Sequence, residues 1–251
     1  MLKRIAVIGD ASAHEALIKA ADAQGAQLKF ADAGGVVPPG SSAVLGPADA
    51  DSLSAALAVA TANDGLLHLL AEAIDCREGR VQGSAKRLQD HAVRFGQALG
   101  LDDDELSALA RGALLIDVGK ILLSNDVLMK KTLLSYDDWL LLQAHTTMGA
   151  DLLVAHGCHT DVVDIVRYHH ECWNGEGYPE GLEKGAVPKL ALMMKILDVY
   201  CAMTSPRHYR TSHASHEDAL EHLKAERGER FNAELVDAFV EHEVGQPFVP
   251  A

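Results

Sequence analysis

The segment from His169 to Leu182, HHECWNGEGYPEGL, combines two adjacent histidines, an acid and a Gly-Tyr-Pro turn. Three further side chains that can bind metal lie elsewhere in the chain, at Asp117, His145 and Asp198. Imidazoles and carboxylates can hold two metal ions about 4 Å apart, one activating water and both neutralising a phosphate group. The set therefore indicates metal-dependent phosphodiester hydrolysis.

These candidate ligands must be positioned by helices, because the sequence from Asn63 onward has a helical pattern almost throughout. Capping signals mark several helix starts, namely Asp102 with Glu105, Ser135 with Asp138, and Asn232. The apolar faces are predicted to be core, and they are supplied by Leu106, Leu109, Leu114, Leu115, Leu140, Leu141 and Leu142. We predict an all-helical bundle over residues 63–251, so the chain is mainly α.

Residues 1–62 have a different pattern, that of a small α/β domain. Strands are predicted at 2–9, near 27–31 and at 42–45, with helices at about 12–24 and 48–61. The unit resembles a truncated response-regulator receiver, in which only Asp10 stands where phosphorylation chemistry needs an acid. We interpret it as a degenerate docking or dimerisation domain, which leaves a homodimer open.

Composition narrows the classes of partner. The formal net charge of -14 and the pI near 5.3 argue against sequence-independent binding to nucleic acid or to an anionic membrane. The four cysteines form no CxxC pair, so we expect reduced thiols rather than disulfides. No segment approaches the ~18 apolar residues of a membrane span, and a cytoplasmic location is the expectation.

Six segments together resemble one known family. They are RLQDHAVRFGQALGL, ALLIDVGK, HTTMGADLL, HHECWNGEGYPEGL, VPKLALMMKILDVYCAM and SPRHYR. In this order and spacing, residues 64–243 resemble the HD-GYP family, bacterial hydrolases of cyclic di-GMP with an HD-type helical fold. The resemblance implies a role in cyclic di-GMP signalling.

Carried over by position, the resemblance implies that Asp117 bridges two ions and that Asp198 serves one of them. His145, His169 and His170 would complete the shell of the other. Lys120 corresponds to a lysine that contacts substrate phosphate, and it shares a face with Asp117 if the helix continues. The remaining ligand-contacting positions match Tyr178, Arg207 and Arg210.

Two departures from the family strike the metal site directly. Ser84 stands where the family has its first metal histidine, and Ile116 stands where it has the histidine of the His-Asp pair. Serine is a poor ligand for a divalent transition metal, and isoleucine cannot coordinate one. We therefore expect one divalent transition metal, Fe, Mn or Zn, or none. Other departures are Asn174, Leu192 and Cys201.

Simpler interpretations stay open for several of these residues. Ile116 could pack in the core while Asp117 only caps or pairs locally, and Tyr178 could pack against the bundle. Trp173 could be a core anchor or a partner contact. Arg207 and Arg210 could form solvated pairs with acids, as surface arginines commonly do.

Three functions follow from these alternatives. In the first, the chain is a catalytically impaired module that binds cyclic di-GMP, or docks to a GGDEF-type diguanylate cyclase through Trp173, Gly177, Tyr178 and Pro179. In the second, it is a slow cyclic di-GMP phosphodiesterase with one ion, in which Asp117 and Lys120 are catalytic. In the third, the bundle is a scaffold without a small ligand. We favour the first, in which the chain is not an enzyme.

Overall fold

The structure is a computed structural model that describes residues 3–8, 26–31, 43–45, 64–130, 132–206 and 213–246. Among these residues, no helix is both long enough and apolar enough to cross a membrane. Asp10 and the two helices predicted before residue 62 lie outside the described residues.

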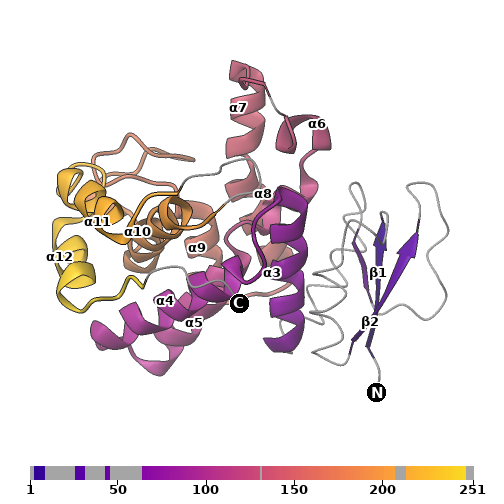
Figure 1. The fold of residues 1–251 in the computed structure, drawn as a ribbon, viewed down its shortest axis with the longest axis horizontal. Helices are drawn as coiled ribbons and strands as arrows, with labels where there is room; N and C mark the ends of the chain where they lie inside the picture. Colours follow the sequence, from indigo (N-terminus) through magenta and orange to yellow (C-terminus); the bar gives the residue numbers. More distant parts are fainter. Residues whose placement is uncertain are drawn as a thin grey trace.

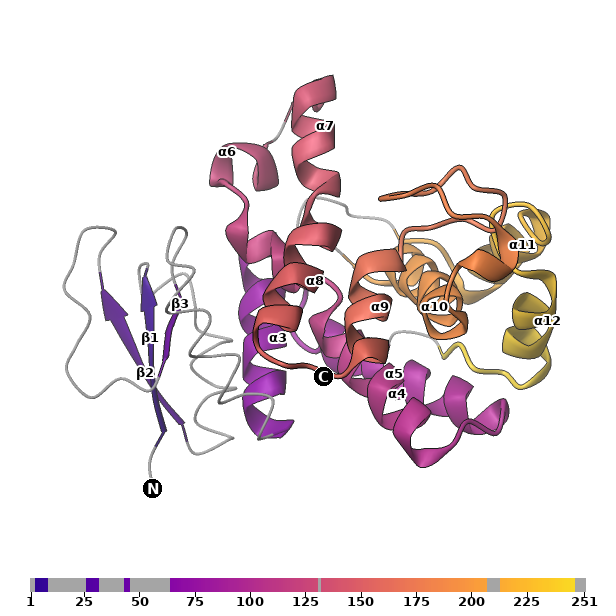
Figure 2. The ribbon, with the colours of Figure 1, turned by 180° about the vertical axis from the view of Figure 1, so that it is seen from behind.

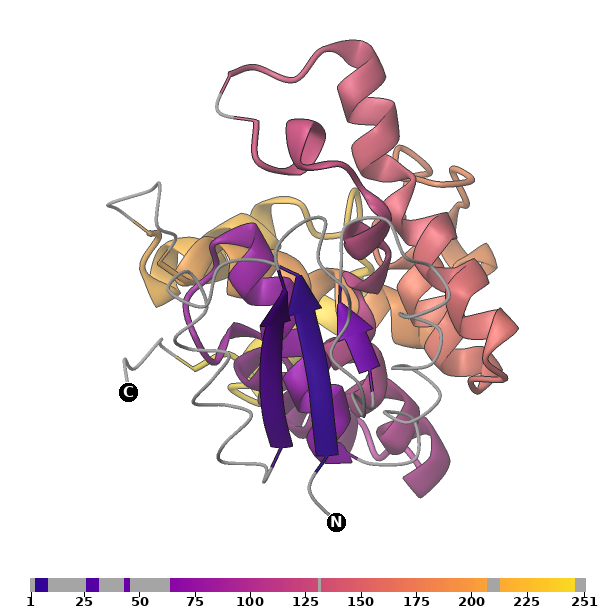
Figure 3. The same cartoon turned by 90° about the vertical axis from the view of Figure 1, so that its right-hand side faces the viewer.

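The N-terminal strands are β1 (Lys3–Ile8), β2 (Ala26–Ala31) and β3 (Ala43–Leu45). They form a parallel sheet in the order β2-β1-β3, with Lys3 paired to Ala26 and Ile5 to Ala43. Figure 3 shows the three strands running in the same direction. The likeness of residues 1–62 to a receiver stays a prediction.

The rest of the described chain is helical, as its pattern predicts (Figure 1). The helices are α3 (Asp64–Glu78), α4 (Ser84–Ala98), α5 (Asp103–Leu115), α6 (Asn125–Leu128), α7 (Tyr136–Gln143), α8 (His145–Ala155), α9 (Thr160–Tyr168), α10 (Lys189–Thr204), α11 (His216–Ala225) and α12 (Ala233–Glu241). Two 3₁₀ turns are η2 (Val118–Leu122) and η3 (Lys184–Ala186).

Helix α10 is the centre of the bundle. Every residue from Leu190 to Leu197 is buried, and all of them except Lys195 are apolar, as expected for a helix at the centre of a core. Helices α4, α9 and α11 pack against it, and α5 packs between α4 and α9 (Figures 1 and 2). Asp198, near the C-terminal end of α10, is thereby placed beside the start of α4.

The predicted caps are confirmed. Asp102 accepts hydrogen bonds from the backbone N–H groups of Asp104 and Glu105, and the Glu105 side chain accepts one from Asp102 in return. Ser135 and Asp138 form the same reciprocal box, and Asn232 caps α12. Each cap fixes where its helix begins, because it satisfies N–H groups that have no partner within the helix.

Part of the predicted core is wrong. Leu109, Leu114 and Leu115 are buried, but Leu140 and Leu141 are 46% and 52% exposed. Helix α7 has only eight residues and projects from the bundle (Figures 1 and 3). The apolar run therefore predicted burial for a helix that the neighbouring α6 and α8 leave largely exposed.

Helix α8 and the turn η2 approach each other closely at Gly119. A Cβ atom added there would lie 1.9 Å from the carbonyl oxygen of His145 and 2.7 Å from the nitrogen of Gly149. The contact brings the segment that carries Asp117 and Lys120 against the first turn of α8. Only glycine allows the two backbones to pack in this way.

We predict that Gly119→Ala destabilises the bundle by about 2 to 4 kcal/mol, because backbone atoms must move to admit the methyl group. Urea unfolding followed by circular dichroism measures the loss. Gly185→Ala is the control, since a Cβ at Gly185 meets nothing within 4 Å. Equal stabilities for the two variants would contradict the close approach.

Candidate metal centre

Four segments bring the predicted metal ligands together. Asp117 follows α5 and precedes η2, and His145 is the first residue of α8. His169 and His170 directly follow α9, and Asp198 lies in α10. Residues from distant parts of the sequence therefore converge because α5, α8, α9 and α10 pack around one another.

Backbone carbonyls orient two of the histidines. Nδ1 of His145 lies 2.6 Å from the Leu142 oxygen, and Nδ1 of His169 lies 2.9 Å from the Val166 oxygen. A carbonyl only accepts, so each Nδ1 carries the proton and each Nε2 keeps a free lone pair. This is the arrangement by which proteins commonly present histidine to a metal.

The Nε2 atoms of His145 and His169 are buried and have no hydrogen-bond partner. One ligand atom from each of His145, His169 and His170 lies within 4.8 Å of the others, the one such group of metal-binding side chains among the described residues. Buried polar atoms normally have partners. These imidazoles therefore fit one transition-metal ion, and they would hold it through neutral nitrogens.

Burial keeps the three histidines neutral. It lowers the pKa of His145 and the pKa of His169 to about 4, although the Asp117 charge opposes the shift. Burial also lowers the pKa of His170 well below its usual value, helped by the other two histidines. The site is thus ready to bind a cation without first losing protons.

The carboxylate of Asp117 borders the histidines and is shared among three side chains. Its Oδ1 lies 3.6 Å from Nε2 of His145 and 2.9 Å from Nζ of Lys120. Its Oδ2 accepts a hydrogen bond of 2.6 Å from Nη2 of Arg80. Lys120 also contacts Glu78 at 2.6 Å. Both proposals for Asp117, local pairing and ligation of an ion, are compatible with this position.

Ion pairing decides the charge state of Asp117. Burial would raise the pKa of this carboxyl, but the Lys120 ammonium and the Arg80 guanidinium outweigh burial and hold the pKa well below its usual range. Lys120 and Asp117 share a face, as predicted, although by another geometry. The α-helix ends at Leu115, and residues three apart align in the 3₁₀ turn that follows.

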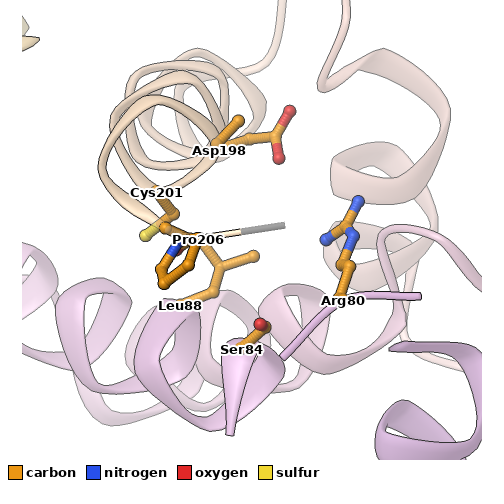
Figure 4. A pocket seen from close by; sticks show the side chains of 8 residues that line it. Arg80, Ser84, Leu88, Asp198, Cys201 and Pro206 are labelled. Carbon is orange, nitrogen blue, oxygen red and sulfur yellow. The ribbon is translucent and has the colours of Figure 1, made fainter. Parts of the chain in front are cut away.

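The opposite side of Asp117 lacks imidazoles among the described residues. The hydroxyl of Ser84 donates a 2.6 Å hydrogen bond to the Val81 carbonyl, and Ile116 is 3% exposed within the core. Figure 4 shows Asp198 and Arg80 pointing toward one another across a pocket that Ser84 also lines. Asp198 is not in the group that the three histidines form, and burial and the Asp117 charge raise its pKa.

The Gly-Tyr-Pro loop covers the histidines. The Tyr178 ring stacks on His170, with centroids 4.7 Å apart. The buried Glu171 carboxylate accepts hydrogen bonds from the backbone N–H groups of Glu180, Gly181 and Leu182 at 2.8 to 3.1 Å. Gly177 passes so close to Glu171 and Cys172 that a Cβ would lie 2.3 Å from the Cys172 nitrogen. The loop is thus built around one acid.

Other predicted site residues have mixed outcomes. Trp173 is half-buried and packs against the core, which agrees with the core-anchor alternative. Arg207 and Arg210 lie outside the described residues. The other histidines include His91, whose Nδ1 contacts the Arg87 carbonyl and whose Nε2 accepts from the N–H of Gln246, as expected for a hydrogen-bonded core residue.

Sequence reasoning missed two cations near the ligands. Arg80 pairs with Asp117 across 37 positions of sequence, and buried Lys195 donates a 3.2 Å hydrogen bond to the His170 carbonyl. No local spacing marks either residue, because each contact depends on how separate segments pack. A buried lysine in the otherwise apolar run of α10 is the one signal that the sequence offered.

Comparison with known proteins identifies the family. A family profile described as "HD domain" matches residues 68–235. The chain belongs to the HD domain family.

A cyclic di-GMP phosphodiesterase response regulator of Xanthomonas campestris is 33% identical over 69% of this chain and 46% of its own length. A cyclic di-GMP phosphodiesterase of Thermotoga maritima is 27% identical over 71% and 48%. This HD domain chain thus spans about half the length of these curated relatives.

Solved structures share the fold. A cyclic GMP-AMP-specific phosphodiesterase of Vibrio cholerae superposes with a TM-score of 0.56 at 23% identity, covering 70% of this chain and 47% of that one. An HDGYP protein from Bdellovibrio bacteriovorus superposes with a TM-score of 0.51 at 17% identity, covering 78% and 62%. The HD-type helical fold of this chain is therefore established.

We predict that Mn²⁺ affinity changes less than about threefold between pH 7.5 and 5.5. The lowered histidine pKa values keep protons off Nε2 until the pH nears 4. For a site of three solvated histidines with a pKa of ~6.5, the Mn²⁺ affinity would fall about 1000-fold over the same pH range. Calorimetric titration with Mn²⁺ at several pH values measures this, and a loss of the larger size would contradict the neutral, buried cluster.

We also predict that Glu171→Ala frees the loop. Three backbone N–H groups lose their acceptor, so stability should fall by about 2 to 4 kcal/mol and amide exchange in residues 178–182 should rise. Glu176→Ala is the matched control in the same loop, because Glu176 is exposed and, among the residues that the structure describes, hydrogen-bonds only to Asn174. Hydrogen–deuterium exchange that is unchanged by Glu171→Ala would refute this role.

Proposed function

We propose that this HD domain acts in cyclic di-GMP signalling as an HD-GYP-like module that binds a cyclic dinucleotide and is impaired as an enzyme. The names of its relatives support the ligand class, since they are phosphodiesterases of cyclic di-GMP or of 3'3'-cGAMP. The retained Gly-Tyr-Pro loop supports the likeness to the HD-GYP subgroup.

One observation supports the proposal that catalysis is impaired. The imidazole donors lie on one side of Asp117, whereas Ser84 and Ile116 occupy the positions that would supply histidines on the other. The Ser84 hydroxyl is committed to a backbone carbonyl, and Ile116 has no donor atom. A single ion held by His145, His169 and His170 beside Asp117 is the arrangement that these residues support.

The protein's own residues suit an anionic ligand. A bound ion would supply positive charge and polarise a phosphate oxygen. Lys120, largely buried next to Asp117, would hold a phosphate charge beside it, and Tyr178 would close over the site from the loop. A two-ion clamp also stabilises the attacking and leaving oxygens, and losing half of it slows hydrolysis by orders of magnitude.

Docking to a GGDEF-type diguanylate cyclase is the second part of this proposal. The loop residues Gly177, Tyr178 and Pro179 form a segment that Glu171 holds in one shape. A fixed loop of this kind presents a defined surface to a partner at low entropic cost. Trp173 would support the loop from beneath, because it packs against the core.

A slow phosphodiesterase with one ion is the second candidate function. The unpartnered Nε2 atoms of His145 and His169 favour it, since they leave strong donors for an ion. In this case Asp117 and Lys120 would be catalytic. Turnover would be slow, because each ~1.4 kcal/mol of lost transition-state stabilisation lowers the rate tenfold.

We predict that the full chain binds cyclic di-GMP and that Lys120→Ala weakens binding about ten- to hundredfold, the loss expected for one charged hydrogen bond. Isothermal calorimetry measures affinity, with circular dichroism to check folding. Lys86→Ala is the control, because Lys86 is exposed and Asp90 is its ion-pair partner within the described residues.

The outcomes separate the functions. Rapid conversion of cyclic di-GMP to pGpG or GMP with Mn²⁺ or Fe²⁺ would favour the second candidate and contradict impairment. Failure to bind cyclic di-GMP, together with failure to capture a diguanylate cyclase, would remove the signalling proposal. A scaffold without a small ligand would then be the remaining function.

A further inference from the structure

Three acids surround the guanidinium of Arg80. Its Nη2 lies 2.6 Å from Oδ2 of Asp117, its Nε lies 2.9 Å from Oε2 of Glu78, and its Nη1 lies 3.8 Å from Oδ1 of Asp75. Gly79, with a φ of 66°, ends α3 and turns the chain so that Arg80 points inward. Two of the three acids are not candidate metal ligands, so the position of Arg80 does not depend on Asp117 alone.

Asp75 adds a second constraint. Its other oxygen, Oδ2, accepts a 2.8 Å hydrogen bond from the backbone N–H of Ala85 in the first turn of α4. Asp75 therefore ties α3 to the start of α4 with one oxygen and faces Arg80 with the other. One residue, Asp75, thus faces the guanidinium and holds the first turn of α4, where Ser84 lies.

The guanidinium lies where a second ion would have to lie. Asp117 contacts it directly, and Asp198 points toward it from α10 across the pocket that Ser84 lines (Figure 4). An ion shared by Asp117 and Asp198 would occupy this side of Asp117, opposite the histidines. A fixed guanidinium and a divalent ion cannot share that volume, and their like charges repel.

We propose that Arg80 is a built-in cation that replaces the second metal ion between Asp117 and Asp198 and thereby limits the centre to one ion. The inference deepens the single-ion function proposed above and rests on it. Arg80 neutralises the carboxylates without activating water, because arginine stays protonated and has no open coordination position. Its N–H groups that face the pocket would attract a ligand phosphate, so positive charge is retained while hydrolysis is not.

A second ion requires both additional ligands and removal of the Arg80 charge. Adding the two absent histidines by Ser84→His and Ile116→His should not allow a second ion to bind, because Arg80 still fills the space between Asp117 and Asp198. Removing the charge as well, with Arg80→Gln, should allow a second ion to bind. Arg80→Lys keeps a positive charge in the same place and should keep the count at one.

The test is the number of Mn²⁺ ions bound per 251-residue chain, measured by calorimetry and by elemental analysis after gel filtration. We expect one ion for the wild type, for Arg80→Lys, and for the double variant S84H/I116H. We expect two ions for R80Q/S84H/I116H. The Arg80→Gln variant should bind a second Mn²⁺ ion at least tenfold more tightly than the wild type binds a second Mn²⁺ ion. Arg227→Gln, which removes a surface pair with Asp237, is the control and should bind one.

The results decide between a built-in cation and a simple structural pair. Two ions in the wild type or in S84H/I116H, or one ion in a folded R80Q/S84H/I116H protein, would overturn the inference. If the triple variant does not fold, Arg80→Gln decides through its melting temperature, which should rise with millimolar Mn²⁺ by more than that of the wild type. An equal rise would also overturn it. If the wild type does not bind cyclic di-GMP, the proposed function is refuted. The numbers of bound Mn²⁺ ions would still test the role of Arg80.

Discussion

The rest of this structure depends on how the buried carboxylate of Asp117 is compensated by its neighbours. It faces His145 on one side, Arg80 on another and Lys120 along its own turn. A buried charge is tolerated only when other charges and hydrogen bonds compensate for it. Helices α3, α5 and α8 must therefore meet at this point, and their meeting creates both the histidine side and the arginine side of the centre.

Backbone contacts fix this meeting point as firmly as the charges do. The turn η2 touches α8 at Gly119, and Arg77 of α3 donates a 2.7 Å hydrogen bond to the Lys120 carbonyl. The carbonyls of Leu142 and Val166 set the tautomers of two histidines. Preorganisation of this kind keeps donors aimed at an ion before it binds, which lowers the cost of binding. The same rigidity would keep the Arg80 guanidinium between Asp117 and Asp198, where it excludes an ion.

Features that a local pattern or the family resemblance marks could be predicted from sequence, and other long-range contacts could not. The predicted ligands His145, His169 and His170 lie together, as the resemblance implies, and capping residues mark the helix starts. Arg80 was missed because its partner is 37 residues away and no periodicity connects them. Leu140 and Leu141 were wrongly placed in the core, because an apolar run does not reveal whether another element covers it.

The asymmetry about Asp117 is the central claim, and anomalous diffraction from crystals grown with Mn²⁺ tests it most directly. We predict one manganese peak, bonded to His145, His169 and His170, with the Arg80 guanidinium in contact with Asp117 on the other side. Two strong peaks bridged by Asp117, with Arg80 displaced from between Asp117 and Asp198, would contradict the account.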